Sequence, residues 1–161
     1  MAMTSDSGRG MTPDELDEFL TTGKLFAKIA TVNEDGIPQI SPVWYAWDGE
    51  AFLVVSKERT GMVKNLRRDP RCGLLVDNVE LPYKRVSVQG AVEFLGPDFD
   101  YETPMRQMVL RYLGEEGMAY AESTMVFPRV PFYVRPLRMT SWNGGGFDRT
   151  FNKETVWREV G

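Results

Sequence analysis

Short runs of alternating apolar and polar residues, separated by residues typical of tight turns, occupy most of the chain. In RVSVQGAVEF, residues 85–94, valine and phenylalanine alternate with polar side chains, as in a strand with one buried face. Asp48-Gly49 separates two other runs and is the strongest short hairpin signal, because both central residues of such a turn need positive φ. The chain is therefore constrained to fold largely as antiparallel sheet.

Six of these runs predict strands, and helical periodicity lies between some of them. The strand-like runs are residues 25–32, 37–47, 50–56, 72–77, 85–94 and 131–142, and the helix-like segments are 13–20, 61–68, 105–113 and 118–123. Thr12 with Glu15 predicts a capping box, and Thr60 predicts the cap of the second helix. This order predicts a mainly β (α+β) fold, a small six-stranded antiparallel barrel with helices on its outside. We expect a single domain over residues 11–161, after a disordered lead-in of residues 1–10.

The residue inventory excludes several kinds of chemistry. The 161 residues include no histidine and one cysteine, Cys72, which excludes Ser-His-Asp and Cys-His catalysis, His-ligated haem and the usual zinc sites. We expect no metal site and no internal disulfide. A net charge of −4 argues against a general nucleic-acid binder. With neither a secretory signal nor an apolar run of membrane-spanning length in the sequence, we expect a cytoplasmic protein that does not enter a membrane.

Basic residues gather in one segment of this acidic chain. Between positions 57 and 71 they number six, against two acidic residues: Lys57, Arg59, Lys64, Arg67, Arg68 and Arg71. Arg67 and Arg68 suit the C-terminal end of a helix, where cations favour the helix dipole. Ser56, Lys57, Arg59, Thr60 and Lys64 instead surround the predicted helix start. This start is either a phosphate site or an ordinary charged helix end.

Aromatic residues gather in the central hairpin, at Trp44, Tyr45 and Trp47. Two interpretations stay open: these rings belong to the barrel core or a dimer interface, or they form a wall against a flat ligand ring. Because a small barrel is not expected to enclose so much aromatic surface alone, we expect the chain to work as a homodimer.

The segment NLRRDPRCGLLVD, with DGIPQISPVWYAWDGEAFLVVS before it and YKRVSVQGAVEF after it, resembles the pyridoxamine 5′-phosphate oxidase-like split-barrel proteins. The closest likeness is to the actinobacterial flavin/deazaflavin oxidoreductase branch, and it covers residues 13–149. The resemblance implies a split barrel and a homodimer with two cofactor sites at the interface, each holding FMN or the deazaflavin coenzyme F-420. The cofactor-binding residues it implies, together with the basic helix start, are Gln39, Ser41, Val43, Trp44, Ser56, Lys57, Arg59, Thr60, Lys64 and Arg85.

The tail SWNGGGFDR resembles the closing segment of the oxidases, in which a tryptophan and a glycine pair contact the flavin and an arginine meets the substrate. These features correspond to Trp142, Gly144, Gly145 and Arg149. Two departures stand out. Met62 replaces a lysine found in many members, so a phosphate would depend on Arg59, Lys57 and Lys64. The substrate-binding histidine of the oxidases is absent, so we do not expect pyridoxamine phosphate oxidation.

The function expected from these features is hydride transfer between a bound FMN or F-420 and a small hydrophobic, conjugated substrate. The likeness around residues 65–71 favours F-420, and the tail favours FMN. No catalytic acid or base can be named, and Tyr45 is the phenol nearest the expected substrate, which Arg149 would also contact. Two alternatives remain: a non-catalytic flavin or deazaflavin binder, and a cofactor-free dimeric module, which Met62 favours.

Overall fold

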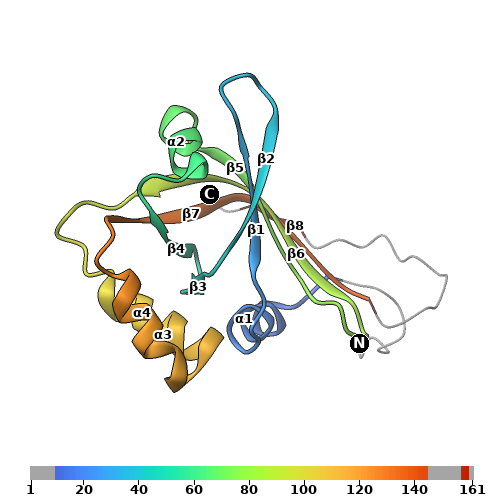
Figure 1. Ribbon diagram of the computed structural model, residues 1–161. Coiled ribbons are helices and arrows are strands. Elements are labelled where there is room, and N and C mark those ends of the chain that lie inside the picture. Colours follow the sequence, from blue (N-terminus) through green and yellow to red (C-terminus); the bar gives the residue numbers. More distant parts are fainter. Residues whose placement is uncertain (1–9, 145–156, 160–161) are drawn as a thin grey trace.

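The computed structural model describes residues 10–144 and the backbone of residues 157–159. Its described strands form one antiparallel sheet in the order β2-β1-β5-β6-β7-β4-β3, with β8 paired to β7. The sheet curls into a half-barrel with helices around it, as Figure 1 shows. The strands are β1 (Ala27–Val32), β2 (Pro38–Val43), β3 (Ala46–Trp47), β4 (Phe52–Lys57), β5 (Arg71–Asp77), β6 (Lys84–Phe94), β7 (Arg129–Asn143) and β8 (Trp157–Glu159).

Helices form in the four predicted segments, the first two after the expected caps, and the third begins three residues earlier than predicted. They are α1 (Pro13–Thr21), α2 (Gly61–Arg68), α3 (Glu102–Leu113), the 3-10 turn η1 (Glu115–Gly117) and α4 (Met118–Thr124). Thr12 and Glu15 form the predicted capping box of α1, and the Thr60 hydroxyl accepts from the Val63 N–H at 3.2 Å. Helices α3 and α4 pack together at one end of the half-barrel, beyond β3 and β4 (Figure 1). None of the described helices has the length and hydropathy of a membrane span.

The expected strand over residues 37–47 is wrong in one respect, because it is interrupted at Trp44 and Tyr45. The Trp44 indole turns towards α3, whereas the Tyr45 ring enters the core. The turn after this run also differs from the prediction. Gly49 has positive φ (97°), but Asp48 does not; its carboxylate instead accepts the N–H groups of Glu50 and Ala51.

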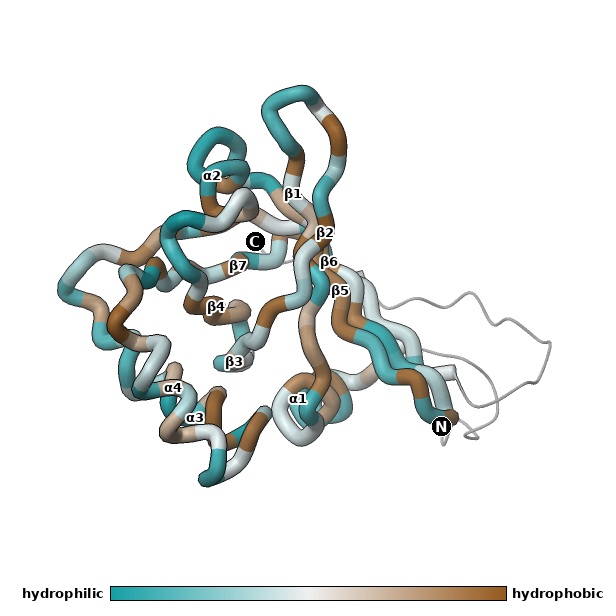
Figure 2. The backbone as a smooth tube through the Cα atoms, viewed as in Figure 1, coloured by the Kyte–Doolittle hydropathy of each residue, from teal (hydrophilic) through white to brown (hydrophobic). Residues whose placement is uncertain are grey.

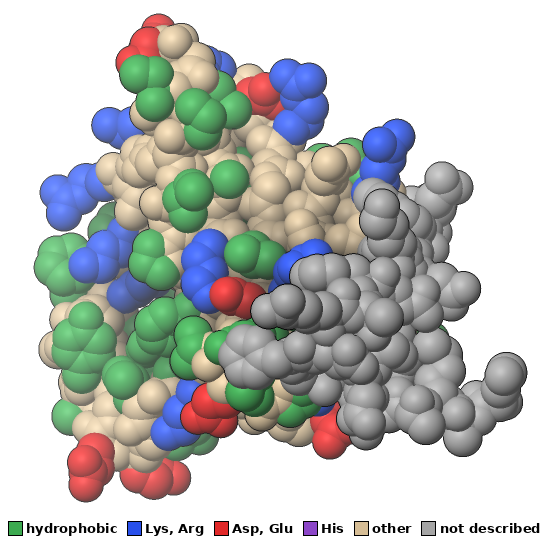
Figure 3. All heavy atoms as spheres, turned by 90° about the vertical axis from the view of Figure 1, so that its right-hand side faces the viewer, with side chains coloured by type: hydrophobic (Ala, Val, Ile, Leu, Met, Phe, Trp, Pro, Cys, Tyr) green, Lys and Arg blue, Asp and Glu red, His purple; other side chains and the backbone are tan. Residues whose placement is uncertain are grey.

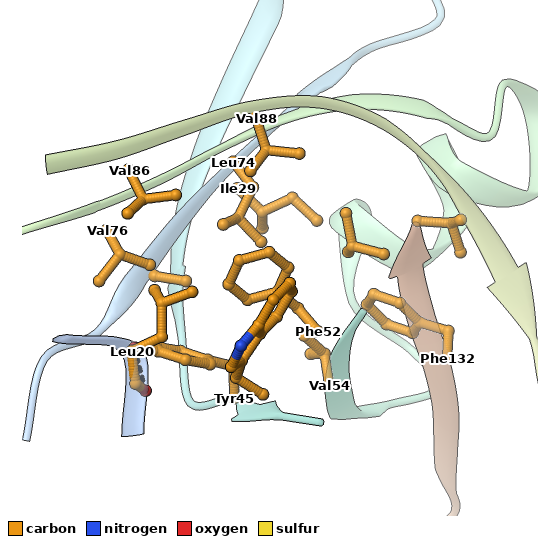
Figure 4. Packing of buried hydrophobic residues seen from close by; sticks show 14 of the residues in the cluster. Leu20, Ile29, Tyr45, Phe52, Val54, Leu74, Val76, Val86, Val88 and Phe132 are labelled. Carbon is orange, nitrogen blue, oxygen red and sulfur yellow. Dashed lines mark hydrogen bonds between the residues drawn. The ribbon is translucent and has the colours of Figure 1, made fainter. Parts of the chain in front are cut away.

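The core fills the inside of the half-barrel. Figure 4 shows Leu20 and Tyr45 meeting side chains from several strands, including Ile29, Phe52 and Val86. Hydrophobic stretches follow these strands in Figure 2, whereas α2 and the β1–β2 hairpin tip are more hydrophilic. The alternation predicted for residues 85–94 is confirmed, because Val86, Val88 and Val92 are all buried. The same segment bends at a register shift between Gln89 and Gly90.

Arg111 of α3 connects this helix to the rest of the half-barrel. Its guanidinium donates to three backbone carbonyl oxygens, those of Gly23 (2.7 Å), Leu20 (3.0 Å) and Tyr45 (3.2 Å). It also lies over the rings of Tyr45 and Tyr112, 4.9 and 5.2 Å from their centroids. One side chain therefore joins α3 to the end of α1 and to the chain entering β3.

Candidate functional site

A pocket of about 300 Å³ opens between the ends of β2 and β4, the start of α2, and helices α3 and α4. Its lining residues divide into an apolar wall and a polar end. The wall consists of Pro42, Val43, Trp44, Val55, Met105, Met108, Val109 and Ala121, and the other lining residues are Ser56, Lys57, Thr60, Tyr120, Thr124 and Arg129. Ligand pockets are typically about 300–1,000 Å³ and combine these two kinds of surface.

Trp44 gives the pocket a flat, fixed wall. Its indole stacks on the Tyr112 ring, with centroids 5.0 Å apart and planes 11° from parallel. The Tyr112 hydroxyl donates to the Leu25 carbonyl at 2.9 Å, which fixes that ring in turn. Helix α3 thus holds Trp44 against the pocket, so the interpretation of Trp44 as a ring-facing wall fits the structure.

The polar end contains the hydroxyls of Ser56, Thr60, Tyr120 and Thr124 and the cations Lys57 and Arg129. The Ser56 and Thr60 hydroxyl oxygens are 3.4 Å apart. Lys57 is the last residue of β4, and its Nζ lies 5.2 Å from the centre of the Phe127 ring. Arg129, the first residue of β7, pairs with Lys57 in the sheet register. The structure therefore brings three of the expected phosphate residues, Ser56, Lys57 and Thr60, to one pocket.

Arg129 is the site residue that sequence reasoning missed. Its Nη2 donates to Thr124, to the carbonyl at 3.3 Å and the hydroxyl at 3.0 Å. Its Nε is buried and has no partner within the described part of the chain. The expected strand began two residues later, at position 131, and the only signal was a cation preceding a strand, which is common. It reaches the pocket because β7 pairs with β4 there, with Arg129 opposite Lys57.

Several expected cofactor residues lie outside the lining of this pocket. Arg59 and Lys64 are exposed to solvent around α2. Gln39 contacts the helix instead, because its Oε1 lies 3.2 Å from the Asn65 Nδ2. Ser41 pairs with Ile29 in the β1–β2 register and is half-buried. Met62 is 4% exposed and packs in the main core, so the position where many relatives have lysine has a structural role in this chain.

The structure corrects the expectation that Tyr45 contacts substrate. Its side chain is fully buried, and its hydroxyl donates to the Leu20 carbonyl at 2.9 Å (Figure 4). Burial raises the pKa of the Tyr45 phenol to about 12. Trp47 is likewise a core residue, and its Nε1–H donates to Asp17 at 2.7 Å. The phenol that lines the pocket is that of Tyr120, which is 61% exposed.

Arg85 and Trp142 lie together at the other end of β7. They are register partners of β6 and β7, and the Arg85 guanidinium is 5.1 Å from the centre of the indole. Trp142 belongs to β7, as the strand predicted over residues 131–142 implied. A Cβ on Gly144 would lie 2.2 Å from the far end of this indole, so a larger residue here would displace the Trp142 ring. Gly145 and Arg149 lie outside the described residues.

The half-barrel with its flanking helices defines a split-barrel protein, as the resemblance implied. A family model for pyridoxamine 5′-phosphate oxidase matches residues 12–143. The chain belongs to this family.

Solved structures support the assignment. An F-420 reductase is 30% identical, with a TM-score of 0.59, over 76% of this chain and 94% of that one. A conserved hypothetical protein from Mycobacterium tuberculosis is 24% identical, with a TM-score of 0.67, over 89% of this chain and 90% of that one. A heme binding protein from Mycobacterium smegmatis is 18% identical, with a TM-score of 0.63, over 92% of this chain and 58% of that one. The fold thus occurs in proteins with different ligands, and the ligand of this chain has to be inferred from its own residues.

Proposed function

We propose that this chain is an oxidoreductase that binds a flavin-type cofactor, FMN or F-420, in the described pocket. It transfers a hydride between that cofactor and a small hydrophobic, conjugated substrate. Membership of the pyridoxamine 5′-phosphate oxidase family supports this proposal, as does the 30% identity to an F-420 reductase. No histidine is present in the sequence to ligate haem, so the heme-binding relative is a weaker guide.

The observation that carries the proposal is the pairing of a flat apolar wall with a cationic end in one pocket. FMN and F-420 each combine a flat ring system with a phosphate group. An apolar ring would contact Val43 and Trp44, and a phosphate would contact Ser56 and Lys57. The ring system and the phosphate of such a cofactor would therefore each contact residues of matching polarity.

When bound, the cofactor supplies the hydride chemistry, and the protein supplies binding, orientation and protection from water. Three methionine and valine side chains, Met105, Met108 and Val109, are buried on the helical side of the pocket and exclude water there. The Asp and Glu side chains of the described residues do not line the pocket. We therefore infer that substrate protons come from solvent, from the cofactor or from the Tyr120 hydroxyl at the pocket.

The proposal includes a homodimer, because one chain does not bring all the implied cofactor residues together. Trp142 is thirteen residues along β7 from Arg129, which is about 40 Å of extended strand. A second copy would have to supply Arg85 and Trp142 if they contact the cofactor bound beside Trp44. This arrangement gives two equivalent sites per dimer.

The test is an absorbance spectrum of freshly purified protein, followed by calorimetric titration with FMN and with F-420. We expect micromolar binding of at least one. Trp44→Ala should bind about fivefold to tenfold more weakly, because ring stacking contributes roughly 1 kcal/mol. Arg67→Ala is the matched control, since this arginine is paired with Glu58 at 2.7 Å, outside the pocket.

The same experiment separates the alternatives. Absence of micromolar binding by both cofactors would refute the proposal and favour a cofactor-free module. Binding followed by no oxidation of the reduced cofactor with a panel of quinones and other conjugated acceptors would favour a non-catalytic binder. Turnover with one of these acceptors identifies the substrate class.

A further inference from the structure

Two cations face each other at the polar end of the pocket. Lys57 and Arg129 are directly paired residues of β4 and β7, and both line the pocket. Side chains at directly paired positions of antiparallel strands lie on the same face, with Cβ atoms about 5 Å apart. Like charges in this arrangement repel one another. An anion bound between the two side chains would offset this repulsion.

The described part of the chain supplies no carboxylate for that purpose. None of the residues lining the pocket is Asp or Glu, and neither Lys57 nor Arg129 takes part in the ion pairs formed among the described residues. The neighbouring carboxylate, Glu58, is held by Arg67 instead. Two positive charges thus face the same space without an anionic partner from the lining.

The Nε of Arg129 is a donor without an acceptor among the described residues, and this nitrogen is buried. A guanidinium carries five N–H donors and stays charged at any pH a protein tolerates. Leaving one of these donors buried without an acceptor is costly, more so than for a neutral donor. An anion that approached this edge of the guanidinium would supply the missing acceptor.

We propose that Arg129 and Lys57 together bind the phosphate group of the ligand, in place of the lysine that Met62 has replaced. The Ser56 hydroxyl lies beside them at the same end of the pocket. This inference rests on the proposed function for the identity of the whole ligand, and it assigns the phosphate to the β4–β7 pair. The shared chemistry is a phosphoryl anion, a monoester in FMN and a diester in F-420.

The first arm of the test compares ligands with and without phosphate. Calorimetric titration uses FMN against riboflavin and F-420 against its phosphate-free ribityl deazaflavin, with native protein, Arg129→Gln and Arg138→Gln. Arg138 is exposed on the same strand and does not line the pocket, so it is the control. We expect the phosphate-bearing member of the bound pair to bind at least tenfold more tightly to native and Arg138→Gln protein. Arg129→Gln should lose most of this advantage, since charge-assisted hydrogen bonds change affinity about tenfold to a hundredfold.

Equal weakening of the phosphate-bearing and phosphate-free ligands by Arg129→Gln would overturn the inference, because the arginine would then shape the pocket rather than bind phosphate. That result would leave the proposed function standing. Arg129→Lys keeps the charge and loses the planar fork, so we expect intermediate discrimination. Full retention of the phosphate advantage in Arg129→Gln would also overturn the assignment.

The second arm uses no flavin, so it tests the phosphate site even if neither proposed cofactor binds. Inorganic phosphate and pyrophosphate are added to the cofactor-free protein, and the midpoint of thermal unfolding is measured. We expect stabilisation of the native and Arg138→Gln proteins that is at least halved in Arg129→Gln and in Lys57→Gln. Equal stabilisation of all four proteins, or stabilisation of none, would overturn the assignment of the phosphate to Arg129 and Lys57.

Discussion

Trp44 and Tyr45 are neighbours in sequence, yet their side chains belong to different parts of the molecule. Trp44 stacks on Tyr112 at the pocket, and Tyr45 is buried beside Phe52 in the core. Consecutive residues of an extended chain point to opposite sides, so the segment between β2 and β3 places one ring on each side. The pocket and the core are thus built from adjacent residues.

Burial of the Tyr45 phenol makes the free energy of unfolding decrease at alkaline pH. Its pKa is raised from 10.0 to about 12 by burial, so the folded state keeps this proton more tightly than the unfolded state does. This contribution to stability is constant below about pH 10 and is lost as pH rises towards about 12. A shift of two pKa units corresponds to a loss of roughly 3 kcal/mol in the free energy of unfolding.

We test this with urea unfolding at a series of pH values, in the native protein and in Tyr45→Phe. The variant should be about 1 kcal/mol less stable near neutral pH, because it lacks the hydrogen bond to the Leu20 carbonyl. Its stability should then fall less steeply above about pH 10. Tyr120→Phe, which removes an exposed phenol, should keep the steep native fall; parallel curves for native and Tyr45→Phe protein would contradict the expectation.

At the scale of elements, the bend between β6 and β7 depends on one glycine. A Cβ at Gly90 would lie 2.7 Å from the Arg135 carbonyl oxygen and 3.2 Å from a Val134 methyl group. The backbone oxygen has little room to move, since it belongs to the longest strand of the sheet. Gly90→Ala should therefore lower the free energy of unfolding by roughly 1–3 kcal/mol.

The matched control is Gly96→Ala, because a Cβ at Gly96 would meet nothing within 4 Å and its φ is not positive. Chemical denaturation of both variants gives the comparison. Equal free energies of unfolding for Gly90→Ala and Gly96→Ala would contradict this expectation, because the strands would then accommodate the added methyl group without loss of stability.

The helices and strands that sequence reasoning located well carry local signals. The Thr12–Glu15 capping box and the alternating valines of β6 depend on neighbouring residues, so the pattern alone specifies them. Arg129 joins the site through pairing with a strand more than 70 residues earlier, which no local pattern encodes. The sequence left open whether Tyr45 and Trp47 belong to the core, because the α1 and α3 contacts that cover them are also distant in sequence.

The whole molecule leaves hydrophobic side chains at its surface. Figure 3 shows one face on which they lie among Lys and Arg side chains. Exposed examples on the strands are Ile40 at 69% and Leu137 at 54%. Such residues suit an interface between two copies, although single exposed side chains are also ordinary.

We expect a dimer by light scattering, with Trp142 of one chain closing the site of the other. Trp142→Ala should leave the dimer and its thermal stability nearly intact, because the side chain is only half-buried at the end of β7. Cofactor binding should weaken by roughly 1 kcal/mol, as for the loss of an aromatic stack. A monomeric native protein, or unchanged cofactor affinity in Trp142→Ala, would contradict this arrangement.

The three carbonyl contacts of Arg111 also have a consequence in time. Their partners are 66 to 91 residues away along the chain, so these bonds close long loops of the fold. Closing loops of this length costs chain entropy before the new contacts add stability. We therefore expect the Arg111 contacts to form after the folding transition state. Arg111→Lys should then accelerate unfolding in stopped-flow experiments and leave the refolding rate nearly unchanged. Arg111 would therefore determine the lifetime of the folded state, with little effect on the rate of folding.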